Sequence, residues 1–211
     1  MRSLEYSRGI AVNQTRLGAA ALRLGRFAEA QGLLNESLET ARQLRDRWGI
    51  GNALNYLGLL EFARGNLESA ETLLRDSMTI FKEDGDQIMV ASILTDLGFI
   101  LIERASNAQA GQVFWRALEL ALRSQAIPIA LYSLAGIAAV HAKEGTTELA
   151  LELAMYSGTH PSSSQQTRDR AGQLQAELEM KLTPRQIETV QTRVHSKTLD
   201  DLAQEVLAKS A

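Results

Sequence analysis

The sequence predicts an all-α fold in which helix pairs stack into a right-handed superhelix, and two observations predict it. The first is composition: only three prolines occur in 211 residues, aromatic residues make up 5%, and Ala, Leu, Glu, Gln and Arg are frequent. This balance favours helices. The second is a 40-residue repeat, since one helix hairpin cannot bury its apolar face alone whereas stacked hairpins can. We expect about four helix pairs followed by C-terminal capping helices.

The repeat is visible at equivalent positions that recur every 40 residues without insertion or deletion. These positions are Ala30, Ala70, Ala110 and Ala150; Gly25, Gly65, Ala105 and Gly145; Leu17, Leu57, Leu97 and Ile137; and Gly18, Gly58, Gly98 and Ala138. The repeat array therefore covers residues 1–157. Its four repeats span about 10–49, 50–89, 90–129 and 130–157.

The first residues align with the end of a second helix, because 1–9 matches 41–49 in the repeat register. We therefore expect a partial preceding helix at 1–9, so that the array begins mid-repeat. Terminal repeats normally carry a polar cap. The pattern favours a piece of a longer parent chain or a start site upstream, with a frayed cap helix as the alternative.

Each repeat holds two helical patterns, best seen in the second repeat. Its first helix is predicted from about residue 51 to 64, and its second begins near Leu67. Gly65 ends the first helix, because glycine tolerates the left-handed conformation that a helix C-terminus often needs. Small residues at Gly58 and Ala70 let the two helices approach closely.

These residues resemble the tetratricopeptide repeat. The stretch 53–78 carries the LG pair at 57–58, the turn glycine Gly65, the alanine Ala70 and a small residue at Ser77. The common repeat has about 34 residues, so these repeats are longer, and we expect an extended second helix.

The junctions at 45–58 and 82–98 narrow the resemblance. They are similar to the long repeats near the C-terminus of STAND-type signalling ATPases, of LuxR-type and antibiotic-regulatory transcription factors, and of adenylate-cyclase-linked regulators. The resemblance implies a non-catalytic protein–protein interaction scaffold, the sensor or partner-binding region of a larger bacterial regulator.

The repeat register fails after Tyr156, and the last part of the chain does not follow the 40-residue pattern. Residues 158–166 are rich in Ser, Pro and Gly and are predicted to be a linker. The capping helices are expected in 167–211, the first a polar helix at about 167–182. A final helix is predicted after Thr198.

Thr183 begins a clear helix signal. It is a typical N-cap residue, followed by Pro184 at the first helical position and Gln186 where a capping box needs it. Two interpretations of this tail remain. Residues 182–190 resemble the opening of a LuxR-type helix-turn-helix, which gives the alternative function of a DNA-binding regulator. Residues 198–207 instead resemble the segment that closes long repeat arrays, and this interpretation is favoured.

Composition and motifs exclude several classes of function. The net charge is −3 and cysteine is absent, so neither nucleic acid, an anionic membrane nor disulfide chemistry is indicated. The sequence lacks a signal peptide and a membrane-length apolar run, and the cytoplasm is the expected location. It also lacks a phosphate-binding glycine loop. His141, His160 and His195 are scattered, so we expect no metal, no cofactor and no catalytic residues.

The tetratricopeptide resemblance implies a binding groove lined by outward positions of each first helix. Carried onto this sequence, these positions are Val12, Thr15, Ala19, Leu22 and Arg23; Asn52, Asn55, Leu59, Phe62 and Ala63; Ser92, Thr95, Phe99, Ile102 and Glu103; and Tyr132, Ala135, Ala139, Ala142 and Lys143. The strongest candidates are Arg23, Asn52, Asn55, Leu59, Phe62, Ser92, Thr95, Phe99 and Tyr132.

This predicted groove is apolar and rich in amides, with little charge. Such a surface suits an amphipathic helix or an extended apolar peptide. The expected partner is a protein, a peptide or another domain of a longer parent chain, and neither nucleic acid nor membrane. The uncapped N-terminal end offers a surface for a second copy. The alternative for the Ala and Leu positions is that they pack between helices.

Overall fold

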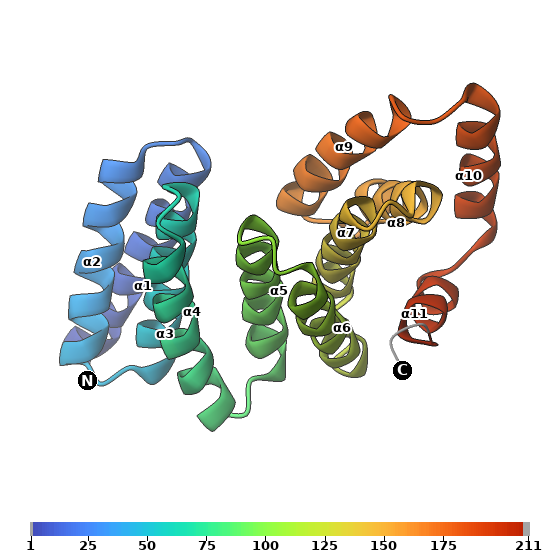
Figure 1. Ribbon diagram of the computed structural model, residues 1–211. Helices are drawn as coiled ribbons and strands as arrows, with labels where there is room; N and C mark the ends of the chain where they lie inside the picture. The colour runs from blue at the N-terminus through green and yellow to red at the C-terminus, as the bar shows by residue number, and fades with distance from the viewer. Residues whose placement is uncertain (1, 209–211) are drawn as a thin grey trace. The chain divides into compact units, whose positions relative to one another are not determined.

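A computed structural model describes residues 2–208 of the chain, with the backbone alone for residues 2–5. The described residues form eleven helices and no strand (Figure 1). The helices are α1 (Arg2–Arg23), α2 (Phe27–Gln43), α3 (Arg47–Ala63), α4 (Leu67–Glu83), α5 (Gln87–Glu103), α6 (Asn107–Arg123), α7 (Ile127–Lys143), α8 (Thr147–Thr159), α9 (Gln165–Glu179), α10 (Pro184–Ser196) and α11 (Leu199–Ala208). The predicted all-α class is confirmed.

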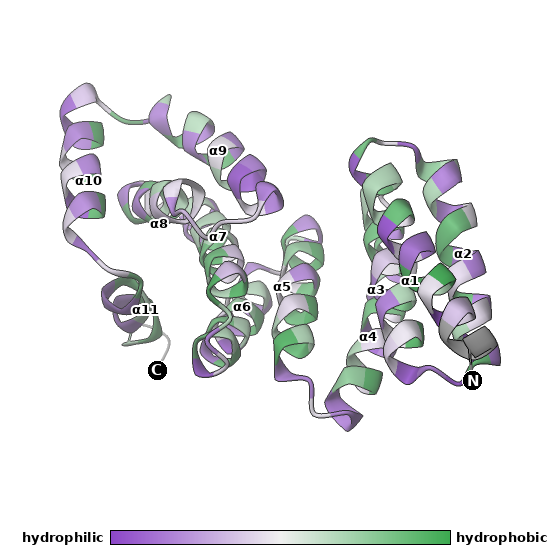
Figure 2. Ribbon diagram, turned by 180° about the vertical axis from the view of Figure 1, so that it is seen from behind, coloured by the Kyte–Doolittle hydropathy of each residue, from purple (hydrophilic) through white to green (hydrophobic). Residues whose placement is uncertain are grey.

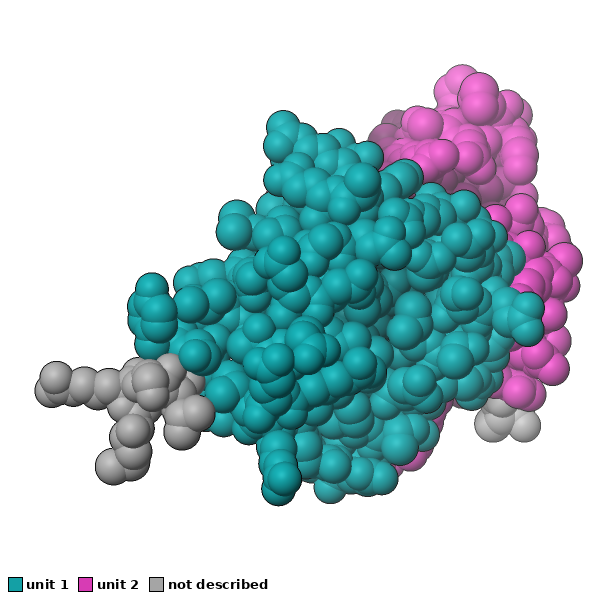
Figure 3. Space-filling view, turned by 90° about the vertical axis from the view of Figure 1, so that its left-hand side faces the viewer, with its two compact units in different colours: residues 1–96 teal, residues 97–211 magenta. Residues whose placement is uncertain are grey.

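The chain forms two compact units, residues 1–96 and 97–211 (Figure 3). Unit 1 holds α1 to α4 and the first half of α5. There α1 packs on α2, α2 on α3, and α3 on α4. Unit 2 holds the second half of α5 and the helices that follow, with α6 packed on α7, α7 on α8, and α8 on α9. Each unit therefore has its own stack of antiparallel helices.

The turns between helices recur every 20 residues and share one conformation. A left-handed residue occupies each turn: Gly25, Arg45, Gly65, Gly85, Ala105, Gln125 and Gly145. Asn66 N–H donates to Glu61 O at 2.9 Å and Gly65 N–H to Phe62 O at 3.0 Å, the hydrogen-bond pair of a Schellman motif.

In repeats two and three the two helices are equally long, and in no repeat is the second helix the longer one, which corrects the expected extended second helix. Each helix from α2 to α7 has 17 residues. The first helix of repeat two begins at Arg47 because Asp46 caps it by accepting the Gly49 N–H. The sequence pattern predicts a start at about residue 51, four residues later. The extra length of the 40-residue repeat is therefore shared between both helices.

Small residues bring paired helices together as predicted. A Cβ atom added to Gly58 would lie 2.8 Å from Leu74 Cγ and 3.3 Å from Ala70 O. A similar atom on Gly18 would lie 2.7 Å from Leu34 Cγ. These distances are shorter than van der Waals contact, so the interior at these positions admits only glycine without rearrangement.

The first helix differs from its prediction. Helix α1 runs without a break from Arg2 to Arg23, so residues 2–9 extend the first helix of repeat one and do not form a separate partial helix. In the register, Tyr6 stands where Asp46 caps α3. A tyrosine cannot supply the side-chain acceptor of an N-cap, and no new helix begins there.

The C-terminal helices begin largely where the sequence placed them. Thr183 and Gln186 form the predicted capping box, with Pro184 at the first helical position. Helix α11 begins after Thr198 and buries Leu202 and Val206. Figure 2 shows α9 and α10 as mostly hydrophilic and α5 and α7 as more hydrophobic.

Helix α9 is placed as an additional first helix of the array. It packs against α8 and α7 as α3 packs against α2 and α1. A Cβ atom added to Gly158 of α8 would lie 3.2 Å from Ala171 Cβ of α9, which shows close packing. The sequence predicts a capping helix here, because the 40-residue register fails after Tyr156.

Candidate functional site

The face made by the first helices of unit 2 contains a cleft of about 230 Å³. Three consecutive inner helices, α5, α7 and α9, build it. The lining residues are Phe99, Ile102, Glu103, Ala135, Ala139, Ala142, Lys143, Arg170, Gln173, Leu174, Glu177, Leu178 and Lys181. The seven from α5 and α7 are all positions that the tetratricopeptide resemblance indicates. We call this site the α9 cleft.

Two of the strongest sequence candidates lie in or beside this cleft but are already engaged. Phe99 and Tyr132 are each 6% exposed, and their ring centroids lie 5.2 Å apart. The Arg170 guanidinium carbon lies 4.0 Å from the centre of the Phe99 ring, a cation–π contact. Gln166 Nε2 donates to the Tyr132 hydroxyl at 2.6 Å. These aromatic rings support α9 and leave little surface for a partner.

The chemistry of the α9 cleft is mixed. Half-buried Ala139 and Ala142 give it a smooth apolar wall, while Glu103, Lys143, Glu177 and Lys181 on its lining are exposed. Carboxylates and ammonium groups are therefore both present on the lining beside an apolar wall. Such a site fits a short segment that places a small apolar side chain inside and polar or charged groups at the edge.

The sequence candidates of unit 1 lie along α1, α3 and the first half of α5. Arg23 is exposed, and Asn52, Leu59, Phe62 and Ser92 are half-buried. Asn55 is 5% exposed, and its Oδ1 has no hydrogen-bond partner. Thr95 is fully buried and donates its hydroxyl to Ala91 O at 3.0 Å. Burial therefore removes the Thr95 side chain from the accessible surface.

A cluster of charges joins the C-terminal helices to α8. The Glu152 carboxylate is buried, with its Oε2 2.8 Å from Arg193 Nε and its Oε1 2.6 Å from Lys197 Nζ. Lys197 also lies 2.8 Å from Glu205. Burial acts to lower the Lys197 pKa, but hydrogen bonds to Glu152 and Glu205 outweigh it, so the pKa is raised above 10.5. Glu152 stands where repeat two has Thr72. This acidic residue at a repeat position was the one signal in the sequence that could have indicated the charge cluster.

Acidic residues at the end of α4 serve an ion pair. Arg47 binds Glu83 at 2.7 Å and Asp84 at 2.8 Å. Among the described residues, no group of three or more His, Asp or Glu side chains is arranged to hold a metal ion. Within residues 2–208, no helix combines the length and apolarity that crossing a membrane requires.

Stacked antiparallel helix pairs with closely approaching glycines define a helical-repeat protein. The sequence model of the tetratricopeptide repeat family matches residues 9–83, and this part of the chain therefore consists of tetratricopeptide repeats. Such repeats generally mediate protein–protein interaction, and the fold is typically non-catalytic. No curated protein matches the sequence.

A solved structure has the same fold across the chain. The crystal structure of BtubC (BKLC) from P. vanneervenii is similar at 18% identity and a TM-score of 0.61, over 99% of this chain and 88% of that chain. At this identity, the similarity concerns the fold alone.

Proposed function

We propose that this chain is a non-catalytic, cytoplasmic interaction scaffold that binds a protein segment on the first-helix face. The observation that carries the proposal is the α9 cleft, which combines an apolar wall of alanines with exposed charges of both signs. A peptide bound there buries a small side chain against Ala139 and Ala142. Its flanking charges pair with Glu103, Lys143, Glu177 or Lys181.

Replacing a small wall residue by a large one tests the site directly. Ala139→Arg fills the α9 cleft, whereas Ala108→Arg adds the same side chain at an exposed position of α6 outside it. The two variants and the wild type are compared as baits in native lysate. The proposal expects a captured protein that Ala139→Arg loses and Ala108→Arg keeps. Equal capture by both variants contradicts the α9 cleft as the binding site.

The role as the sensor or partner-binding region of a larger bacterial signalling or transcriptional regulator is part of the proposal. Its support is the resemblance of the junctions at 45–58 and 82–98. An intramolecular partner is compatible with the α9 cleft, because a tethered segment has a high effective concentration and needs little intrinsic affinity.

The alternative, DNA recognition by the tail, has an unfavourable surface. Helix α11 buries its apolar side and exposes Asp200, Asp201 and Glu205. Carboxylates oppose binding to a phosphate backbone. We expect no sequence-dependent gel shift by the intact chain at moderate salt. A tight, sequence-dependent shift that is lost on deletion of residues 197–211 would favour the alternative.

A further inference from the structure

A second groove lies on the opposite helices of the repeat, within unit 1. It runs between α2 and α4, with α3 as its floor, and has a volume of about 690 Å³. Leu38, Leu54 and Leu57 give it an apolar lining, and Glu68 and Asp76 stand on the α4 side. We call it the outer groove of unit 1.

The 40-residue register places an equivalent groove in unit 2, two repeats later, between α6 and α8 with α7 as its floor. Leu118, Leu134 and Ile137 there correspond to Leu38, Leu54 and Leu57. On the α8 side, Glu152 corresponds to Thr72 and Tyr156 to Asp76.

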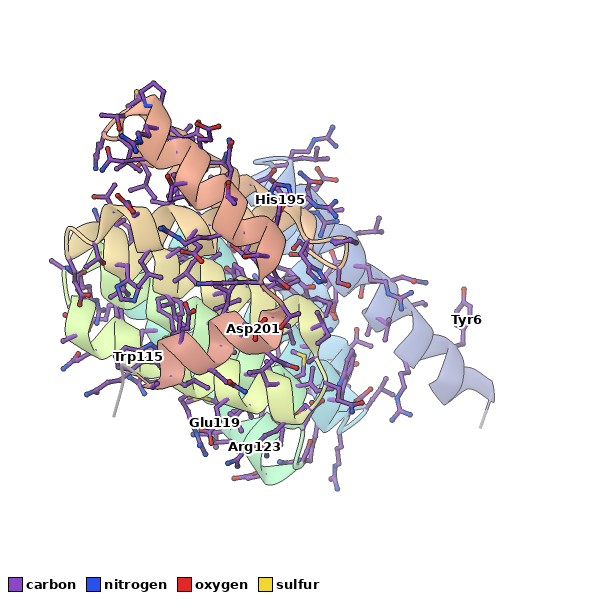
Figure 4. All side chains as sticks on the ribbon, turned by 90° about the vertical axis from the view of Figure 1, so that its right-hand side faces the viewer. Tyr6, Trp115, Glu119, Arg123, His195 and Asp201 are labelled. Carbon is purple, nitrogen blue, oxygen red and sulfur yellow. The ribbon has the colours of Figure 1, made fainter. Side chains whose placement is uncertain are left out.

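The equivalent groove in unit 2 is covered by the chain's own C-terminal helices. Helix α11 contacts α6, and Figure 4 shows α11 with Trp115 of α6 near one end and Asp201 near the other. Lys197, two residues before α11, binds Glu152 of α8. This contact places the start of α11 beside α8, where burial raises the pKa of Tyr156 and the charges of Asp200 and Asp201 raise it further.

Exposure of equivalent residues supports the comparison. Leu118 and Leu134 are 0% exposed and Ile137 is 1% exposed, whereas Leu38, Leu54 and Leu57 are each 8% exposed. In unit 2 the apolar side of α11, with Leu202, Ala203 and Val206, is buried. The repeat thus shows which kind of element its outer groove accepts: a short amphipathic helix.

The charges of the two grooves differ at the position that α11 approaches with its acidic start. In unit 2 this position is Tyr156, beside Asp200 and Asp201. In unit 1 it is Asp76, and Glu68 lies two turns earlier on the same helix; both are exposed. Two aspartates placed against Asp76 would repel it. A helix like α11 therefore fits the α4 side of the outer groove of unit 1 better when its first turn is basic.

We propose that the outer groove of unit 1 binds an amphipathic helix of a partner protein that carries Lys or Arg where α11 carries Asp200 and Asp201. Helix-in-groove recognition of this kind reads apolar side chains three and four residues apart. The site uses different residues from the α9 cleft, so it adds a second binding surface to the scaffold.

Two labelled peptides test the proposal with the full chain. The first is the segment 197–208, and the second is the same segment with Asp200→Lys and Asp201→Lys. Fluorescence anisotropy at low salt should show that the basic peptide binds with a Kd of roughly 10–100 µM, and that the acidic peptide binds at least about tenfold more weakly.

Variants of the protein locate the binding. The double variant Glu68→Lys with Asp76→Lys should bind the basic peptide at least about tenfold more weakly than the wild type does. The matched control, Asp169→Lys with Glu188→Lys, makes the same change in net charge at exposed residues of unit 2 and should have no effect. Ser69→Trp blocks the groove without adding charge and should also prevent binding.

Five outcomes overturn the proposal. Equal binding of both peptides, or self-association of the chain that Ser69→Trp abolishes, would make α11 of a second copy the occupant. If the control variant Asp169→Lys with Glu188→Lys lost as much affinity for the basic peptide, the binding would be non-specific attraction between opposite charges. Loss only with Ala139→Arg would place the peptide in the α9 cleft. Binding of neither peptide would leave the groove without a helical ligand.

Discussion

Lys197 places its ammonium nitrogen 2.6 Å from the buried carboxylate of Glu152, and this pair joins the segment before α11 to α8. Arg193 of α10 lies 2.8 Å from the other oxygen of the same carboxylate. One acidic side chain, nearly enclosed by protein, therefore fixes two successive C-terminal segments against the array.

Glu152→Gln should lower the free energy of unfolding by about 1–3 kcal/mol, because hydrogen bonds to a charged group are lost and two cations lose their shared partner. Thermal and urea denaturation measure the effect. Glu188→Gln, at an exposed position of α10, is the control and should change stability little. Equal stability of both variants would show that the cluster contributes nothing.

The same ion pair predicts a dependence on alkaline pH. Because the Lys197 pKa is raised above its ordinary value of 10.5 in the folded chain, its contribution is complete below that value and is lost as pH rises through the folded pKa. The melting temperatures of the wild type and Lys197→Met should differ below the ordinary value of 10.5 and converge as the pH rises through the raised pKa of Lys197. A constant difference over this range would contradict the assignment.

Phe114 and Gly136 should show strong energetic coupling. Phe114 stands where repeats one and two have Leu34 and Leu74, and a Cβ atom on Gly136 would overlap its ring. Gly136→Ala should cost about 1–3 kcal/mol through overpacking. In the background of Phe114→Leu the same change should cost much less, and a double-mutant cycle measures the difference. Additive effects would mean that the two sites are independent.

Ala105→Gly should stabilise the turn after α5. Ala105 has φ of 57°, and an L-residue in this region costs roughly 1–2 kcal/mol. The greater freedom of glycine in the unfolded chain offsets part of that gain, so a rise of about 0.5–1 kcal/mol is expected. Gly145→Ala, the opposite change at the equivalent turn, should destabilise. Loss of stability in Ala105→Gly would contradict this account.

Local signals in the sequence predicted the elements whose cause is local. Gly65 marked a left-handed turn, Thr183 with Gln186 marked a capping box, and Gly58 marked a close helix approach. The sequence failed where tertiary packing decides. Turns at Arg45 and Gln125 carry no glycine, and Tyr6 does not begin a helix although its repeat partner Asp46 does.

Only part of the candidate site could be predicted, because the rest of it depends on tertiary packing. The face of α5 and α7 follows from the tetratricopeptide resemblance, which indicates Phe99, Ala139 and Lys143 as groove positions. The contribution of α9 did not follow, because its sequence has left the register. Only Leu174 and Leu178, four residues apart, indicate a packed side on this polar helix. The burial of Phe99 under Arg170 depends on that long-range packing.

Site-specific photo-crosslinking tests the scaffold proposal most directly. A benzophenone side chain replaces Ala142 in the α9 cleft, or Ala108 on the exposed side of α6 as the control. In native lysate, the scaffold account predicts a discrete covalent adduct with one protein from position 142 and none from position 108. Adducts of equal yield from both positions, or from position 108 alone, would contradict it.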